Sequence, residues 1–256
     1  MCDLTIPIRT APLSIPRPPR RGKIAGVTSV SRPLPRLVAA EAFADVPADR
    51  LLAVLEAVTM VLTLPHRAAE RVDALVVPTG QGEDWRLTDA IRAWETGPAL
   101  RHLLVANTDS AERTYRPLTL DRLRGLGLRR TDGVVLQAEP VTGTGRQATW
   151  VVEQVRALGI GSVALVVSPY HLVRVYLTVL RACDDADLRI PMVPLPVAVA
   201  PDAPVPETGA AGYDLVAGEV SRLLRYPGQG WIATPERLRD YLRWLWSEHR
   251  PLLTGA

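Results

Sequence analysis

The chain has 256 residues, 47% of them hydrophobic, and a formal net charge of +3, which is enough material for a sizeable core. All but one of its 30 basic residues are arginines, and no basic helix is interleaved with aromatic residues, so we do not expect nucleic-acid binding. The two cysteines, Cys2 and Cys183, have neither metal-site nor disulfide spacing, which argues against a disulfide-stapled fold and favours a reducing compartment.

The sequence offers no candidate membrane anchor. The longest apolar run, 51–64, includes Glu56 and is shorter than the roughly 18–20 residues that a spanning helix needs. No apolar signal core follows Arg20 and Arg21. We therefore expect a cytoplasmic protein without stable membrane insertion, while an arginine-rich leader also suits a transit peptide.

Residues 1–40 differ in composition from the rest of the chain. They hold seven prolines, seven basic residues and one acid, Asp3. Such a segment cannot bury much apolar surface, so we predict an irregular tail. Residues 41–256 are predicted to form a single domain.

Apolar periodicity in this domain predicts strands and helices in alternation. Strands are predicted at 73–78, 102–106, 133–138, 163–167 and 188–197, and helices at 48–64, 87–94, 118–124, 146–158, 169–182, 213–225 and 235–246. Pro191, Pro194 and Pro196 make the last strand bent or edge-like. This alternation predicts an α/β fold with a doubly wound, mostly parallel sheet of about five strands, flanked by helices and closed by a helical pair at 210–248.

Polar residues follow four successive predicted strands. Ligands of such sheets bind outside the carboxyl ends of the strands, so these residues form the candidate site: Gly80, Gly82 and Arg86; Asn107; Glu139 and Thr142; Ser168, His171 and Arg174.

The segment 163–174 carries the clearest signal. An unbroken apolar run is followed by Ser168, which suits a helix N-cap, and by Pro169, which suits the first helical position. His171 and Arg174 are three residues apart and share a face of the first turns, beside free backbone N–H groups. We expect an anion-binding pocket, with the Glu139 carboxylate one strand away and pointing into the same opening.

Each candidate also has a structural interpretation. His171 could be a neutral histidine that caps a strand end, and Arg174 could pair with a carboxylate. Arg86 could form a surface ion pair with Glu83 or Asp84. The carboxylate at 139 could be a partner for Arg174, or it could accept ribose-type hydroxyls or act as a general base. The loop 142–145 could cradle phosphate or only cap a helix.

These residues resemble a known family. Asp73, Leu75, Val76, Val77 and Gly80 with Arg86, then Glu139 and Thr142, then Ser168, Pro169, Tyr170, His171 and Arg174 are similar to the motifs of the YdcF/SanA/ElyC-like family, a bacterial domain of poorly known function. The resemblance covers about 73–197, and the segment 218–230 is similar to the tail of the cytoplasmic YdcF type. It implies a Rossmann-like fold. The glycine pair usual after the second strand is replaced by Asn107 and Thr108.

The resemblance implies S-adenosylmethionine binding as one candidate activity, reported for the YdcF type. For the SanA and ElyC types it implies a link to the cell envelope. We expect an anionic, nucleotide-like or phosphorylated small molecule as ligand. Two alternatives stay open: a hydrolase or transferase acting on a phosphate-linked metabolite of envelope metabolism, with His171 as acid/base and Glu139 as its partner, and a non-catalytic interaction module. No metal site is implied, and the oligomeric state is not predicted.

Overall fold

The computed structural model describes residues 37–255, so the predicted tail, residues 1–40, lies almost entirely outside the described residues. Five strands form one sheet: β1 (Ala74–Pro78), β2 (His102–Ala106), β3 (Val134–Leu136), β4 (Val163–Val167) and β5 (Met192–Pro196). Every neighbouring pair is parallel, in the order β3-β2-β1-β4-β5. The predicted α/β class and parallel sheet are confirmed, and the strand order is Rossmann-like.

The helices fall close to their predicted positions. They are α1 (Ala48–Leu62), α2 (Asp84–Thr96), α3 (Leu120–Gly125), α4 (Thr144–Ala157), α5 (Pro169–Asp185), α6 (Gly212–Arg225), α7 (Pro235–Glu248) and α8 (Arg250–Thr254), with short 3-10 turns η1 (Ala40–Phe43), η2 (His66–Arg71) and η3 (Pro227–Gln229). The short η turns and α8 were not predicted, because elements of three to six residues leave no periodic apolar pattern.

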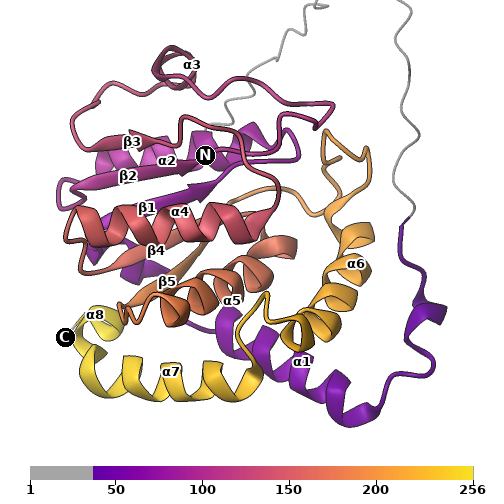
Figure 1. Ribbon diagram of the computed structural model, residues 1–256. Helices are drawn as coiled ribbons and strands as arrows, with labels where there is room; N and C mark the ends of the chain where they lie inside the picture. Colours follow the sequence, from indigo (N-terminus) through magenta and orange to yellow (C-terminus); the bar gives the residue numbers. More distant parts are fainter. Residues whose placement is uncertain (1–36, 256) are drawn as a thin grey trace, which may run out of the picture. The chain divides into compact units, whose positions relative to one another are not determined.

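The chain order places helices on both faces of the sheet. α4 and α5 pack side by side on one face, and α2 lies behind the sheet on the other (Figure 1). The strand order reverses between β1 and β4, and the strands point toward the side where α6 lies (Figure 1). In a sheet of this kind, a crevice opens at that reversal, outside the carboxyl ends of the two central strands.

Burial explains why the central strands were predicted almost to the residue. Every residue of β1 and β4 is buried, as expected for parallel strands that are covered on both faces. Their apolar runs end where the chain reaches polar or glycine-containing segments. β3 is only half-buried and lies at an edge of the sheet, so fewer residues pair than the apolar pattern suggested.

The proline-containing strand β5 occupies the opposite edge, as its sequence predicted. Prolines have no N–H to give to a ladder, so they are confined to such positions. Two buried tyrosines hold this edge in place. The Tyr241 hydroxyl accepts from the Met192 N–H at 2.7 Å and donates to the Ile190 carbonyl at 2.9 Å. The Tyr176 hydroxyl donates to the Met192 carbonyl at 3.0 Å.

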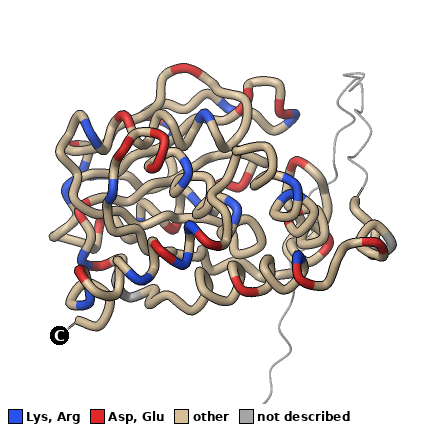
Figure 2. Tube along the Cα trace, turned by 60° about the horizontal axis from the view of Figure 1, so that its bottom comes forward, with Lys and Arg blue, Asp and Glu red and all other residues tan. Residues whose placement is uncertain are grey.

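Charged residues of both signs are interspersed along the described chain (Figure 2). Several arginines pair with carboxylates from distant segments, including Arg237 with Asp184 and Arg239 with Glu56. The arginine-rich composition is therefore used at least in part within the fold. Among residues 37–255, no helix has the length and apolarity required to cross a membrane.

We expect Tyr241→Phe to lower the free energy of unfolding by about 1–3 kcal/mol. The change keeps the ring but leaves a buried N–H and a buried carbonyl without their shared partner. Urea unfolding followed by circular dichroism measures the loss. Tyr213→Phe is the matched control, since its side chain is exposed. An equal loss in the two variants would contradict the claim that the Tyr241 hydroxyl stabilises β5 through its hydrogen bonds.

Candidate functional site

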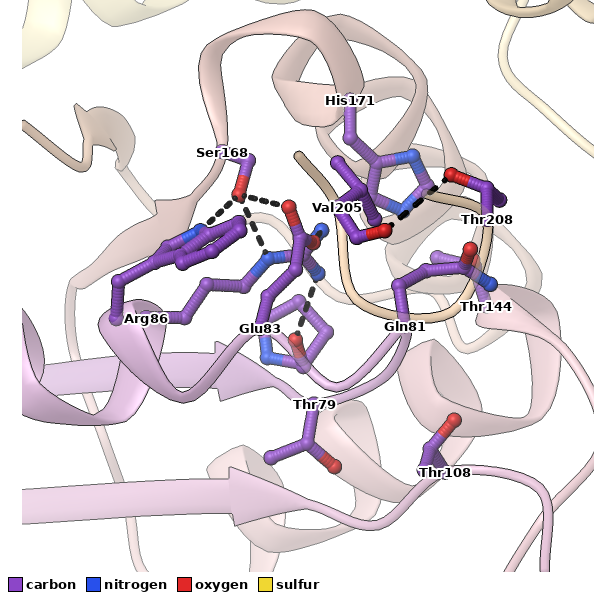
Figure 3. Close-up of polar contacts among 12 residues, drawn as sticks. Thr79, Gln81, Glu83, Arg86, Thr108, Thr144, Ser168, His171, Val205 and Thr208 are labelled. Carbon is purple, nitrogen blue, oxygen red and sulfur yellow. Dashed lines mark hydrogen bonds and ion pairs between the residues drawn. The ribbon is translucent and has the colours of Figure 1, made fainter. Parts of the chain in front are cut away.

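A cleft of about 1040 Å³ lies at the carboxyl edge of the sheet, which is large enough for a nucleotide-sized ligand. Its walls come from the segments that follow β1 and β2, from the start of α4, from the N-terminal half of α5 and from most of the length of α6. The polar residues that line it include Thr79, Gln81, Arg86, Thr108, Glu112, Thr142, Thr144, Arg146, His171, Arg174, Glu207, Thr208, Glu219 and Arg222. Figure 3 shows several of these side chains around the opening.

The turn after β1 forms one wall of the cleft in a conformation that few residues tolerate. Gly80, Gln81 and Gly82 all have positive φ, at 145°, 58° and 68°. A Cβ at Gly80 would lie 3.0 Å from the Thr108 hydroxyl, so glycine allows the backbone to approach the next loop closely. A left-handed non-glycine residue such as Gln81 is uncommon and is typical of binding loops.

The carboxylate of Glu112 holds this turn, and a second carboxylate, that of Glu207, also lines the cleft. Glu112 accepts from the Gln81 N–H at 2.9 Å and from the Thr108 hydroxyl at 2.8 Å. Burial raises the pKa of Glu112 in spite of these hydrogen bonds. Burial acts in the same direction on Glu207, but hydrogen bonds from Thr114 and the Arg113 backbone outweigh it and lower the pKa of that carboxyl. The two groups differ in how readily they take up a proton.

Arg86 lies in a buried network beneath the cleft (Figure 3). Its guanidinium pairs with Glu83 and donates to the Pro78 carbonyl and to the Ser168 hydroxyl, each at 3.1 Å. The Ser168 hydroxyl in turn donates to Glu83 at 2.8 Å and accepts from the Trp85 indole at 2.9 Å. The guanidinium of Arg86, the hydroxyl of Ser168 and the carboxylate of Glu83 therefore all have hydrogen-bond partners within the protein.

This network corrects two sequence-based interpretations. Ser168 occupies the N-cap position of α5, but its hydroxyl does not cap the helix, because the buried network uses it. The ion pair of Arg86 with Glu83 is formed, but both side chains are at most 2% exposed, so it is not a surface pair. Glu83 directly precedes α2 and stands three residues from Arg86, within reach of its guanidinium.

We expect Arg86→Met to cost about 3–5 kcal/mol of unfolding free energy, since it leaves a buried carboxylate unpaired. Adding Glu83→Gln to that variant should recover part of the loss. Chemical denaturation measures both values. The control is Arg124→Met, which breaks an exposed pair with Asp121 and should cost about 1 kcal/mol or less; an equally small loss for Arg86→Met would show that the network is not stabilising.

A second cluster of charges lines the cleft itself. Arg174 donates through Nε and NH2 to the two oxygens of Glu219 on α6, and through NH1 to the Thr144 hydroxyl at 3.1 Å. Its NH2 group also lies 2.8 Å from Nδ1 of His171. Arg222 adds a further hydrogen bond to Glu219 at 3.1 Å. Three helices, α4, α5 and α6, are thereby joined through one guanidinium.

The electrostatics of this cluster favour a neutral ring and an ionised carboxylate. Burial and then the guanidinium of Arg174 lower the pKa of His171 from 6.5 to about 3, against the opposing effect of Glu219. Burial alone would raise the pKa of Glu219, but its electrostatic contacts and hydrogen bonds with His171, and then with Arg174, hold that pKa well below its usual range. His171 is therefore uncharged near neutral pH.

This depressed pKa makes stability depend on pH in a defined window. Between pH 6.5 and 5.0 the unfolded chain binds a proton at His171 and the folded chain does not, so stability falls as the pH falls, by about 2 kcal/mol over this range. We expect His171→Gln to remove this component. Unfolding free energies at pH 6.5 and 5.0 test it, and an identical pH dependence in both proteins would contradict it; Glu219 titrates only below this window.

Residues 142–146, which lead into α4 and form its first turn, line the cleft. Gly143, with φ of 82°, is the N-cap and supplies no side-chain cap, so N–H groups of the first turn remain for another acceptor. Thr142, Thr144 and Arg146 all line the cleft. The side chain of Arg146 is exposed and has no ion-pair partner among the described residues.

The structure brings together five of the nine residues predicted from the sequence. Gly80, Arg86, Thr142, His171 and Arg174 line one cleft. The other four are not among the residues that line this cleft: Gly82, Asn107, Glu139 and Ser168.

Glu139 is the main correction. It is exposed and follows β3, which lies three positions from β4 in the sheet, not one strand away as expected. The carboxylate beside His171 and Arg174 belongs to Glu219. Asn107 is buried, and its side chain bonds the backbone of Thr108 and Ala138 at 2.9 and 3.4 Å. A Cβ at Gly82 would lie 2.8 Å from Thr114.

Sequence reasoning missed Glu112, Glu207, Glu219 and Arg222 as site residues. Glu219 and Arg222 stand three residues apart on one face of α6. That spacing was the available signal, but only the packing of α6 on α5 shows that the pair faces Arg174. Nothing in the loops at 112 and 207 distinguishes those carboxylates from solvated ones.

The chain was compared with known proteins. No protein-family model matches it, and no curated protein matches it in sequence. Within residues 37–255, no group of three histidine, cysteine, aspartate or glutamate side chains is arranged to hold a metal ion.

Proposed function

We propose that this protein binds a nucleotide-like or phosphorylated small molecule in the cleft at the carboxyl edge of the sheet, with S-adenosylmethionine, which has an anionic carboxylate at one end, as the leading candidate. The observation that carries the proposal is the distribution of polar groups around one large opening. Arg146 and Thr144 line it beside the first turn of α4, and the carboxylates of Glu112 and Glu207 line it as well.

These two sets of groups suit the two kinds of polar group on such a ligand. A carboxylate or phosphate would accept hydrogen bonds from the first turn of α4, where the helix dipole favours negative charge. The guanidinium of Arg146 would add a charge-assisted hydrogen bond. The carboxylate oxygens of Glu112 and Glu207 would accept hydrogen bonds from ribose hydroxyls or from an ammonium group. S-adenosylmethionine carries a carboxylate, an ammonium group and ribose hydroxyls.

The proposed relation to the YdcF/SanA/ElyC-like family supports the same ligand. Its most specific block, Ser168 to Arg174, contributes His171 and Arg174 to the cleft lining. The segment 218–230, which resembles the tail of the YdcF type, contributes Glu219 and Arg222. Two separate parts of the resemblance thus meet at one site.

An enzymatic function, as a hydrolase or transferase on a phosphate-linked metabolite, is the second candidate. A general acid works best when its pKa lies near the working pH, and a pKa of about 3 for His171 argues against that residue. Glu112 is the better candidate, because burial raises the pKa of its carboxyl and it lines the cleft. Loss of turnover in Glu112→Gln, with ligand affinity kept, would favour this function.

The binding proposal is tested by isothermal titration of the protein with S-adenosylmethionine, S-adenosylhomocysteine, AMP and inorganic phosphate. We expect at least one of the nucleotides to bind, and Arg146→Ala to weaken that binding by about tenfold, or ~1.4 kcal/mol, through loss of a charged hydrogen bond.

Arg243→Ala is the control for this titration, because that arginine is exposed on α7 and does not line the cleft. Its affinity should match that of the unchanged protein. Absence of heat with every member of the panel, on protein shown to be folded by circular dichroism, would contradict the proposed function.

A further inference from the structure

His171 meets its charged neighbours through only one of its two ring nitrogens. Nδ1 lies 2.8 Å from NH2 of Arg174 and 3.4 Å from Oε2 of Glu219. Nε2 has no hydrogen-bond partner among residues 37–255. Among these residues, the side-chain nitrogens that are both buried and unpaired belong to His102, Arg122 and Arg130, so Nε2 of His171 is not buried. Nε2 is therefore open to the cleft that the ring lines.

The chemistry of the guanidinium decides which nitrogen carries the hydrogen. Arginine has five N–H donors and no acceptor. A ring nitrogen at hydrogen-bond distance from it has to accept, so Nδ1 carries no hydrogen. Glu219 is the more distant neighbour of Nδ1, with Oε2 at 3.4 Å against 2.8 Å for NH2 of Arg174, so the guanidinium is the closer partner of this nitrogen. In a neutral ring, the hydrogen then resides on Nε2.

We propose that Arg174 is a positioning residue that holds His171 as the Nε2–H tautomer, so that the ring presents a fixed hydrogen-bond donor to an acceptor oxygen of the ligand. The inference rests on the proposed function and makes its ligand class more specific. The part of the ligand that reaches the ring carries a carbonyl, carboxylate or phosphoryl oxygen, and a group with only N–H donors is rejected there.

The groups around the ring keep it from taking a second proton. Arg174 on α5 is closest, and Arg86 on α2 adds to its effect, so both oppose a positive ring. Glu219 on α6 acts in the other direction, but its charge is shared with Arg174 and Arg222. Burial of the ring works with the arginines. The donor is thus present across the whole neutral range and does not switch with pH.

Ring nitrogen spectra of the full chain labelled with ¹⁵N-histidine test the tautomer directly. The His171 signals are assigned as those missing in His171→Gln. We expect a bare Nδ1 and a protonated Nε2 from pH 8 to pH 5. An Nδ1–H tautomer or an imidazolium at pH 7 would overturn the proposal.

Variants at 174 test the positioning role. In Arg174→Met the ring keeps Glu219 but loses the opposing charge, so we expect it to titrate between pH 5 and pH 8. Arg174→Lys retains a charged donor and should keep the neutral Nε2–H ring. If the ring behaves the same in the methionine variant as in the unchanged protein, Arg174 does not position it. If the methionine variant does not fold, the lysine variant and the unchanged protein still decide, since a changed tautomer in the lysine variant would count against the proposal.

A titration with S-adenosylmethionine and AMP connects the ring to the ligand. His171→Gln keeps an N–H near the position of Nε2, so its affinity should fall by at most about threefold. His171→Leu removes the donor and should lose about tenfold. An equal loss in both variants would show that no hydrogen bond is donated. Failure of both probes to bind the unchanged protein would count against the proposed function alone, because the ring spectra need no ligand.

Discussion

The cleft depends on two arginines that are withdrawn from water and held by buried carboxylates. Arg86 pairs with Glu83, and Arg174 pairs with Glu219; all four side chains are at most 14% exposed. Removing a guanidinium from water is costly, and only a nearly complete set of hydrogen bonds offsets it. The turn after β1, the start of α5 and the helix α6 are therefore restricted to the arrangement that supplies these bonds, and the cleft wall inherits that rigidity.

The two arginines have different tasks because they lie at different depths. Arg86 is 2% exposed and its network closes on itself beneath the cleft, so its effect on a ligand is to fix the strand ends. Arg174 lies closer to the cleft surface, where α4, α5 and α6 meet. It donates hydrogen bonds to Glu219 and Thr144 and also contacts the ring of His171, which lines the cleft. The three-residue spacing of His171 and Arg174 brings the two side chains into contact, and in the proposed tautomer Arg174 would determine that the free ring nitrogen of His171 is a donor.

How much of this was predictable from sequence differs between the fold and the site. The strands at 102–106 and 163–167 were predicted to the residue, because buried parallel strands are continuous apolar runs that end at polar turns. Local spacing likewise identified His171 and Arg174. Glu139 was misplaced because strand order is not a local property: β2 and β3 are added on the same side of β1, which carries the end of β3 away from β4. Glu219 was missed because it is 45 residues from Arg174 and only helix packing joins them.

The charge balance of the cleft bears on how a ligand is selected. Glu219 is shared by Arg174 and Arg222, and Glu83 neutralises Arg86, so most of the cationic charge is already compensated within the protein. Net attraction for an anion then rests on Arg146 and on the first turn of α4. Because the remaining donors are directional, the proposed ligand would be selected by the position of its acceptor oxygens more than by its charge. Raising the ionic strength screens an exposed guanidinium such as Arg146 but leaves the buried pairs nearly unaffected. Added salt should therefore lower the affinity for the ligand more than it lowers the discrimination between ligands.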